Sequence, residues 1–316
     1  MTRGVLVTGG QGFVGKALAA RALSNGFAVR VSSRQELDAA EARLEYSQVD
    51  DLGPATDWLD ALQGVNTVVH CAGRAHIVVD TAADPLSAFL TVNTEGTLNL
   101  AHQAVEARVN RFVFVSSVGV NGSHTAPGNP FHEADKPNPH NAYALSKWKA
   151  EQGLLRIADE TGLEVVIIRS PLVYGCNAPG NFGSLMRAVQ CGWPLPLGAV
   201  HNQRSMVALD NLVDFIVTCI AHPQAANQTF LVSDGHDLST TELVQGMARA
   251  AGVSARLLPV PVWALQAGAT LLGKGDLVQR LCSNLQMDIS KARSLLGWVP
   301  PVSVDEGLRR AVGGGA

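Results

Sequence analysis

Two side chains of the sequence, Tyr143 and Lys147, carry groups that can move a proton. They form a Tyr-x-x-x-Lys pattern, which puts both side chains on one face if the segment is helical. A nearby ammonium favours the phenolate, so we expect Tyr143 to exchange a proton near neutral pH. Upstream, Ser116 and Ser117 end an apolar run. A hydroxyl there can hold a substrate oxygen beside the Tyr143 phenol, so these residues form one candidate catalytic site.

A glycine-rich segment from Thr8 to Gly15 follows the first apolar run and opens the first helical pattern. Glycines allow a tight turn and a close approach of the backbone to a pyrophosphate, and the helix N-terminus offers free amides to phosphates. The strand-turn-helix context makes this a specific signal for a dinucleotide. The alternative is a tight turn without a ligand.

The end of the second apolar run predicts which dinucleotide binds. An acid at this point would bond the ribose 2′-hydroxyl of NAD, whereas an arginine would accept the 2′-phosphate of NADP. The sequence has Ser32-Ser33-Arg34 and no carboxylate. Because a guanidinium fork suits phosphate, we expect NADP rather than NAD, with NAD as the second choice. The alternative interpretation of Arg34 is a solvated residue at a helix start.

Alternating apolar runs and helical patterns must position these residues. The runs cover 5–7, 27–31, 65–69, 112–115 and 165–168, with a weaker run at 44–49; the helical patterns cover 13–24, 85–107 and 142–159. Most runs are continuously apolar, as strands buried on both faces require. The sequence predicts an α/β fold, a doubly wound parallel sheet of the Rossmann type.

The alternation ends after Arg169, where Pro, Gly and Asn become frequent. We therefore expect an NADP-binding Rossmann domain over residues 1–170. Residues 171–316 are expected to form mainly a smaller substrate-binding region, with some segments returning to the Rossmann core. Ligands of open α/β folds bind at the carboxyl edge of the sheet, which this region would cover.

Composition excludes several other classes. The chain has 316 residues, of which 47% are hydrophobic, and its net charge of −3 gives no basic field for nucleic acid or a membrane surface. The five cysteines include no Cys-x-x-Cys pair, which is typical of reduced thiols. No secretory signal or membrane-length apolar segment is evident. We expect a cytoplasmic protein without a metal, a nucleic-acid partner or a membrane partner.

Taken together, these motifs resemble the extended short-chain dehydrogenase/reductases of the nucleotide-sugar epimerase/dehydratase group. The resemblance covers nearly the whole chain, from Val5 to Trp298. Beyond the loop at Thr8–Gly15 and the Tyr143/Lys147 pair, it includes these segments: Asp51-Leu52, His70 to Gly73, Val92 to Thr97, Arg169 to Gly175 and Ile289 to Trp298.

The resemblance implies a role for each matching residue. The catalytic set would be Ser117 binding the reacting oxygen, Tyr143 as general acid/base, and Lys147 holding the nicotinamide ribose. Asn93 is interpreted as a helix-bend residue rather than a reactant. The cofactor-binding set would be Gly9, Gly12, Phe13, Val14, Gly15, Arg34, Asp51, Leu52, Ala72, Gly73, Asn93, Tyr143, Lys147 and Pro171.

Departures from the family pattern narrow the chemistry. Val118 and Gly119 stand where sugar 4,6-dehydratases carry an Asp-Glu pair, so dehydration is not expected. Leu172 replaces the usual Asn, which weakens the transfer of diphosphate contacts. For the substrate, a UDP-sugar, the expected contacts are Ser117, Asn181, Arg204 and Arg280. A salt bridge at the surface is the alternative role for each arginine.

Within the family, the chain resembles the 4-reductases of UDP-4-keto-6-deoxy-N-acetylhexosamines in O-antigen (lipopolysaccharide) synthesis. The main prediction is therefore NADPH-dependent reduction of a 4-keto nucleotide sugar. The alternative is a UDP-hexose 4-epimerase with tightly bound NAD. A cofactor sensor without catalysis would lack the Tyr/Lys pair, and a hydroxysteroid-type dehydrogenase would have no use for Arg204. Family analogy also implies a homodimer through the helices at 85–107 and 142–159.

Overall fold

The computed structural model describes residues 4–34, 44–75, 84–271, 273 and 275–313. Its main sheet has seven parallel strands in the order β3-β2-β1-β4-β5-β6-β9, and β7 and β8 pair in a second parallel sheet. The strands are β1 (Gly4–Thr8), β2 (Ala28–Ser33), β3 (Glu45–Gln48), β4 (Thr67–His70), β5 (Arg111–Ser117), β6 (Glu164–Ser170), β7 (Leu172–Tyr174), β8 (Met206–Ala208) and β9 (Gln228–Leu231). The predicted doubly wound Rossmann sheet is confirmed.

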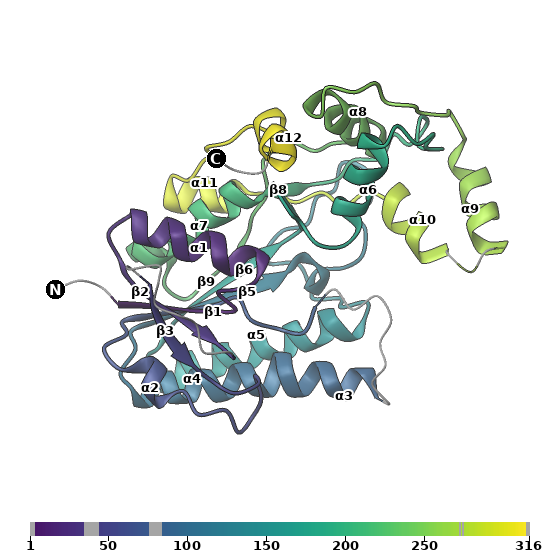
Figure 1. Ribbon diagram of the computed structural model, residues 1–316. Coiled ribbons are helices and arrows are strands. Elements are labelled where there is room, and N and C mark those ends of the chain that lie inside the picture. The colour runs from purple at the N-terminus through teal and green to yellow at the C-terminus, as the bar shows by residue number, and fades with distance from the viewer. Residues whose placement is uncertain (1–3, 35–43, 76–83, 272, 274, 314–316) are drawn as a thin grey trace.

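Helices cover both faces of the main sheet (Figure 1). In chain order, the first helices of the structure are α1 (Phe13–Ser24), α2 (Leu59–Leu62), α3 (Pro85–Leu90), α4 (Gly96–Glu106), α5 (Ala142–Thr161) and α6 (Asn181–Gln190). After these come α7 (Leu209–Ala221), α8 (Thr240–Ala250), α9 (Val262–Leu271), α10 (Gly275–Cys282), α11 (Ser290–Leu296) and α12 (Val304–Gly313). Short turns are η1 (Thr91–Glu95), η2 (Val118–Val120) and η3 (Pro223–Ala225).

The central strands are apolar on both faces because each face packs against helices. In β1, Val5 and Val7 belong to the core cluster under α1 and α7, whereas Leu6 belongs to the cluster under α4 and α5. All three side chains are fully buried. This arrangement explains why the strand sequences are continuous apolar runs rather than alternating ones.

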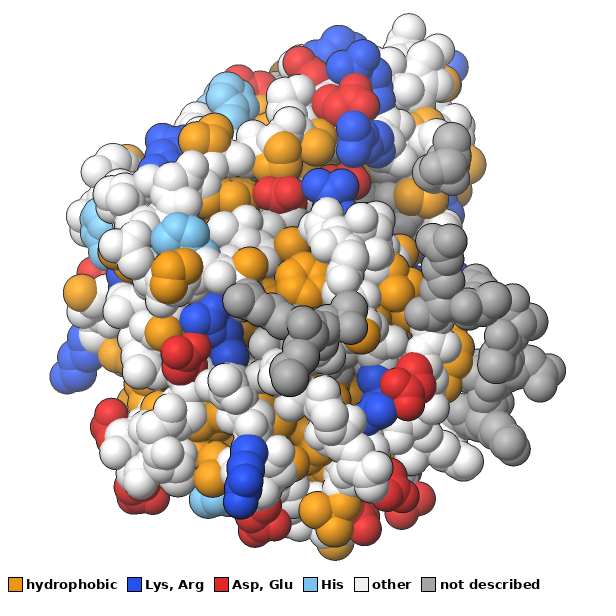
Figure 2. All heavy atoms as spheres, turned by 90° about the vertical axis from the view of Figure 1, so that its left-hand side faces the viewer, with side chains coloured by type: hydrophobic (Ala, Val, Ile, Leu, Met, Phe, Trp, Pro, Cys, Tyr) orange, Lys and Arg blue, Asp and Glu red, His pale blue; other side chains and the backbone are white. Residues whose placement is uncertain are grey.

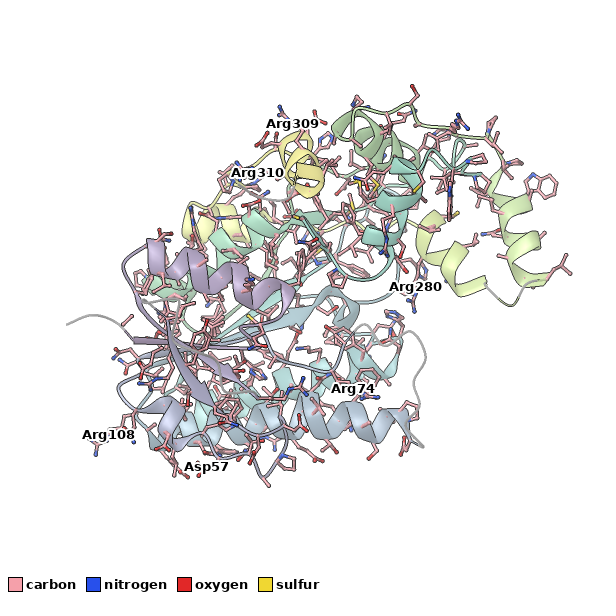
Figure 3. All side chains as sticks on the ribbon, in the orientation of Figure 1. Asp57, Arg74, Arg108, Arg280, Arg309 and Arg310 are labelled. Carbon is pink, nitrogen blue, oxygen red and sulfur yellow. The ribbon has the colours of Figure 1, made fainter. Side chains whose placement is uncertain are left out.

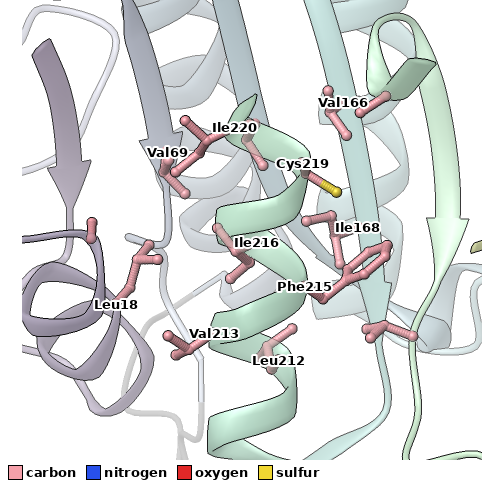
Figure 4. Packing of buried hydrophobic residues seen from close by; sticks show 14 of the residues in the cluster. Leu18, Val69, Val166, Ile168, Leu212, Val213, Phe215, Ile216, Cys219 and Ile220 are labelled. Carbon is pink, nitrogen blue, oxygen red and sulfur yellow. The ribbon is translucent and has the colours of Figure 1, made fainter. Parts of the chain in front are cut away.

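Helix α7 shows how a segment beyond residue 170 packs on the main sheet. Its buried stripe includes Leu212, Phe215 and Ile216, which lie against Val69 and Ile168 of the strands (Figure 4). Strand β9 pairs with β6 in parallel register, and α11 contributes to the same core cluster. The main sheet and its core therefore include elements from both halves of the chain.

The predicted helix over 85–107 is divided in the structure. A π-helical turn, η1, separates α3 from α4 and contains Asn93. Such a turn has one more residue than an α-helical turn and is frequent at functional sites. By contrast, α1 has the bounds that the sequence predicts. Helix α5 continues beyond its predicted end at residue 159 to Thr161, where the left-handed C-cap Gly162 terminates it.

The remaining elements, α6, α8, α9, α10 and α12, lie beyond the carboxyl edge of the sheet (Figure 1). Their core includes Tyr174, Phe182 and Met247. Within the described ranges, no helix is both long and apolar enough to cross a bilayer, and no group of three His, Cys, Asp or Glu could hold a metal ion. On the face drawn in Figure 2, cationic and anionic side chains are interspersed.

Candidate active site

The loop between β1 and α1 leaves room for a ligand because glycine is required in it. Gly9 has φ +67°, and a Cβ on it would lie 2.9 Å from the Ala72 backbone. A Cβ on Gly15 would lie 2.2 Å from the Gly9 oxygen, too close for any other residue. The N-cap of α1, Gly12, has no side chain to cap the first-turn amides, which stay available to an anion. These features fit the pyrophosphate of a dinucleotide.

Next to this loop, a buried chain of hydrogen bonds fixes the end of β4. The Thr97 hydroxyl donates to the Asn93 oxygen at 2.7 Å, so it accepts from His70 Nε2 at 3.0 Å. His70 Nδ1 is then the acceptor for the Thr8 hydroxyl at 2.7 Å. Burial lowers the pKa of His70 to about 3, and the Lys147 charge acts in the same direction. His70 is therefore a neutral structural link between β1, β4 and α4.

At the end of β2, the expected phosphate-binding arginine makes an ion pair at the surface. Arg34 Nη1 lies 2.9 Å from Asp51 Oδ1, and the two side chains are 76% and 86% exposed. The Arg34 charge is thus paired with a carboxylate. Ser33 accepts a hydrogen bond from Gln11 at 3.0 Å. The residues after Arg34, 35–43, lie outside the described residues.

A cleft of about 860 Å³ lies at the carboxyl edge of the sheet and brings most predicted site residues together. From the predicted sets, its lining includes Gly9, Gly12, Phe13, Val14, Gly15, Gly73, Ser117, Tyr143, Lys147, Pro171, Arg204 and Arg280. Six predicted residues are not part of this lining: Arg34, Asp51, Leu52, Ala72, Asn93 and Asn181.

Helix α5 delivers the proton-exchanging pair to the cleft. Asn141 caps its N-terminus by accepting from the Ala144 amide at 2.8 Å, which sets Tyr143 in the first turn. One turn further, Lys147 is buried and donates from Nζ to the Val115 oxygen at 3.0 Å. Lys147 Nζ also lies 4.5 Å from the centre of the Phe114 ring. The Tyr143 ring contacts Phe89 edge-on, with 6.1 Å between ring centres.

Burial of the Tyr143 phenol acts against the expected exchange of a proton near neutral pH. Desolvation by the surrounding protein raises the pKa of Tyr143 to about 12. The same cause lowers the pKa of Lys147 to about 8, so Lys147 loses its proton more readily than a lysine in water. The expectation from the sequence rests on the attraction between the two groups, whereas desolvation is the largest cause of both pKa shifts.

The two serines at the end of β5 have different surroundings. The Ser116 hydroxyl is buried and donates to Glu151 Oε1 at 2.5 Å. Ser117 begins the turn η2, where its hydroxyl oxygen accepts from the Gly119 amide at 3.1 Å. That bond leaves the Ser117 proton available to a substrate oxygen, which agrees with the choice of Ser117 over Ser116.

Asn93 uses its side chain within the protein. Its Oδ1 accepts from the Arg74 amide at 2.7 Å, and its Nδ2 donates to the Arg74 oxygen at 3.1 Å and to the Ser146 hydroxyl at 3.0 Å. The π turn lets this side chain reach both partners from inside the helix. These contacts make Asn93 a structural residue of the helix bend, as its interpretation from the sequence has it.

The far end of the cleft carries two arginines. Arg204 is mostly buried, donates from Nη1 to the Ser283 oxygen at 3.0 Å, and has a pKa lowered by that burial. Arg280 is exposed on α10, on the side of the C-terminal region that faces the sheet (Figure 3). The lining of the cleft includes no Asp or Glu among the described residues. This end is therefore suited to an anionic group such as a diphosphate.

Sequence reasoning did not find one buried group beneath the cleft, the ion pair between Glu151 and Arg169. Arg169 Nη2 lies 2.7 Å from Glu151 Oε2, and the side chains are 7% and 3% exposed. Two features of the sequence indicate this pair. Glu151 follows Lys147 by four residues on the same helix face, and Arg169 ends an apolar strand.

Comparisons with known proteins agree with the fold and show the family of the chain. A model of the NAD dependent epimerase/dehydratase family matches residues 5–233. The chain is 45% identical over 312 residues to a UDP-glucose 4-epimerase of Vibrio cholerae, covering 98% of this chain and 94% of the relative. The UDP-glucose 4-epimerase of Thermus thermophilus, solved with NAD, is 23% identical with a TM-score of 0.77, covering 98% and 97%. The UDP-glucuronic acid 4-epimerase of Bacillus cereus, also solved with NAD, is 20% identical with a TM-score of 0.78, covering 98% and 95%.

Proposed function

We propose, for a chain that belongs to the NAD dependent epimerase/dehydratase family, that it interconverts the two configurations at C4 of a UDP-hexose and retains NAD throughout. The observation that carries this proposal is the 45% identity to a UDP-glucose 4-epimerase over 98% of the chain. It favours the epimerase alternative of the sequence analysis over the 4-reductase.

The catalytic residues have the groups that this reaction needs. Tyr143 takes the proton of the sugar 4-hydroxyl and later returns it, while Ser117 holds the same oxygen by a hydrogen bond. Lys147 supplies a positive charge beside the phenol, and its contact with Val115 fixes its direction. The chemistry that bound NAD supplies is the uptake of a hydride from C4 and its return to the opposite face. The sugar is neither oxidised nor reduced overall.

The cofactor preference follows from the end of β2. A cation that already pairs with Asp51 offers less to a 2′-phosphate than a free one, which supports NAD over NADP. The glycine loop serves both cofactors equally, since it contacts only the pyrophosphate. At the other end, Arg204 and Arg280 would hold the UDP diphosphate in a cleft whose described lining includes no acid.

A second candidate is the NADPH-dependent reduction of the 4-keto group of a UDP-4-keto-6-deoxy-N-acetylhexosamine. The observation that favours it is the absence of a carboxylate at Ser32, Ser33 and Arg34, where an NAD-binding chain would carry one. Tyr143 would then donate its proton to the new alkoxide. A cytoplasmic location, a role in O-antigen precursor synthesis and a homodimer through α3 to α5 stay predictions.

One experiment separates the two functions. The purified protein is incubated with UDP-glucose or UDP-N-acetylglucosamine without added cofactor, and the nucleotide sugars are separated by anion-exchange chromatography. The 4-epimerase proposal predicts formation of the C4 epimer, together with NAD released on denaturation. The proposal is overturned if no UDP-hexose is converted and a keto nucleotide sugar instead drives stoichiometric oxidation of NADPH.

A further inference from the structure

Glu151 is a buried carboxylate that the proposed reaction does not use. Arg169 holds both of its oxygens, with Nε at 3.1 Å from Oε1 and Nη2 at 2.7 Å from Oε2. The Ser116 hydroxyl is a further donor to Oε1, at 2.5 Å. A pair with so little exposure is weak evidence of added stability, because the desolvation of two charges offsets their attraction. Its location in the fold points to another role.

Helix α5 makes hydrogen bonds to two successive residues of β5, directly before the catalytic serine. Lys147 binds the Val115 oxygen and Glu151 binds the Ser116 hydroxyl. Directly after Ser116, the Ser117 hydroxyl lies beside the first turn of α5, since a Cβ added to Gly119 would lie 3.3 Å from both Ser117 Oγ and Ala144 Cβ. The same helix carries Tyr143 in its first turn. The distance between the Ser117 hydroxyl and the Tyr143 phenol therefore depends on both hydrogen bonds.

The network continues from Glu151 to a loop of the cleft. Arg169 donates from Nη1 to Asn121 Oδ1 at 3.0 Å, and Asn121 donates from Nδ2 to the His132 oxygen at 2.9 Å. Asn121 directly precedes Gly122, which lines the cleft. The carboxylate thus joins β5, β6, α5 and the segment after η2 at one point.

We propose that Glu151 is a positioning residue that holds the Ser117 hydroxyl in reach of the Tyr143 phenol and the Lys147 ammonium. It acts through Ser116 and Arg169 and does not touch the substrate. The proposal deepens the proposed function, on which its activity assay rests.

The charge of Glu151 has a second consequence for Lys147. Burial lowers the pKa of Lys147, while Cys71 and Glu151 counteract that effect. Among the described residues, His70 also interacts with the ammonium, which lowers the pKa of His70. Removal of the negative charge at position 151 leaves the desolvation less opposed, so Lys147 would lose its proton at lower pH.

The test compares three variants. Glu151→Gln removes the charge, and Glu151→Asp keeps it on a shorter side chain. Ser116→Ala removes the hydrogen bond between β5 and Glu151. Two quantities are measured for each folded variant. One is kcat and KM for the UDP-hexose. The other is the pH dependence of Lys147 methylation by formaldehyde and cyanoborohydride, read by mass spectrometry on protein without substrate.

For Glu151→Gln, we expect kcat lower by about 10- to 100-fold with KM unchanged, because a small misplacement of reacting groups has effects of this order. The midpoint of Lys147 methylation should move to lower pH. Ser116→Ala should lower kcat without moving the midpoint, and Glu151→Asp should restore the midpoint. The positioning role of Glu151 is refuted if Glu151→Gln keeps the wild-type kcat and the wild-type midpoint of Lys147 methylation. It is also refuted if kcat falls only in proportion to the folded fraction while that midpoint is unchanged. Should the wild type convert no UDP-hexose, the proposed function fails, yet the methylation still tests Glu151.

Discussion

The catalytic end of the cleft and the end of β2 hold their charges in opposite ways. Beneath the catalytic end, Glu151 and Arg169 are 3% and 7% exposed and each makes several hydrogen bonds. At the end of β2, Arg34 and Asp51 are more than three-quarters exposed and joined by one contact of 2.9 Å. The first pair joins β5, β6, α5 and the segment after η2, whereas the second lies at the rim of the sheet.

This difference suggests which properties of the chain are easy to change. An exposed pair contributes roughly 0–1 kcal/mol to stability, so substitutions at the end of β2 that alter the cofactor preference would hardly destabilise the fold. Removal of one partner from a buried pair lowers the free energy of unfolding by about 3–5 kcal/mol, so we expect few substitutions to be tolerated at Glu151 and Arg169. We expect the chemistry to be the constrained property of this protein and the cofactor preference the adaptable one.

The largest effect is expected at the catalytic end, for Tyr143→Phe. Loss of the phenol removes the only proposed acid/base, and kcat should fall by about 10²- to 10⁴-fold. Binding of NAD, followed by fluorescence quenching, should be largely retained. Tyr46→Phe, on β3, is the matched control and should keep full activity. A Tyr143→Phe variant with near wild-type turnover would remove the central acid/base from the account.

A second test compares the two ion pairs directly by stability. Arg169→Met leaves Glu151 buried without its partner and should lower the free energy of unfolding by about 3–5 kcal/mol. Asp51→Asn should change it by no more than about 1 kcal/mol. Urea unfolding followed by circular dichroism measures both. Equal effects of the two substitutions would show that burial does not distinguish the two ion pairs.

His70 extends the contrast to pH. Its pKa is about 3 when folded and near 6.5 when unfolded, so the unfolded chain binds more protons between these values. The free energy of unfolding should therefore fall as pH drops below about 6.5. His70→Asn should make this dependence shallower, whereas the exposed His102→Gln should not. Identical pH dependence of stability in all three proteins would show that His70 is not the group responsible.

The smallest effect is expected for Arg34→Ala. With Asp51 left unpaired at the surface, NAD affinity should change little, because the proposed NAD contacts are those of the glycine loop. NADP affinity should fall only if Arg34 leaves Asp51 to bind the 2′-phosphate. Titration of both cofactors against wild type and variant measures this. A large loss of NADP binding alone would favour the 4-reductase alternative.

The sequence predicts more of the first half of this protein than of the second, for a physical reason. Continuous apolar runs and the glycine loop are local patterns, so the bounds of α1 and the positions of the central strands, to within one or two residues at each end, follow from them. The short strands β7, β8 and β9 were not predicted, since they depend on pairing between distant segments. The Tyr143, Lys147 and Ser117 site was predicted from spacing and resemblance. The rise in the Tyr143 pKa was not, because desolvation depends on everything packed around the ring.

The central claim is that hydride leaves C4 of a UDP-hexose and returns to the same carbon in the same cleft. The most direct measurement is incubation of the protein with UDP-glucose deuterated at C4, followed by mass spectrometry of the nucleotide sugars. Return of the hydride to the same carbon predicts the C4 epimer with its deuterium retained and none lost to solvent. Epimer without the label, or label found in added NADP, would contradict it.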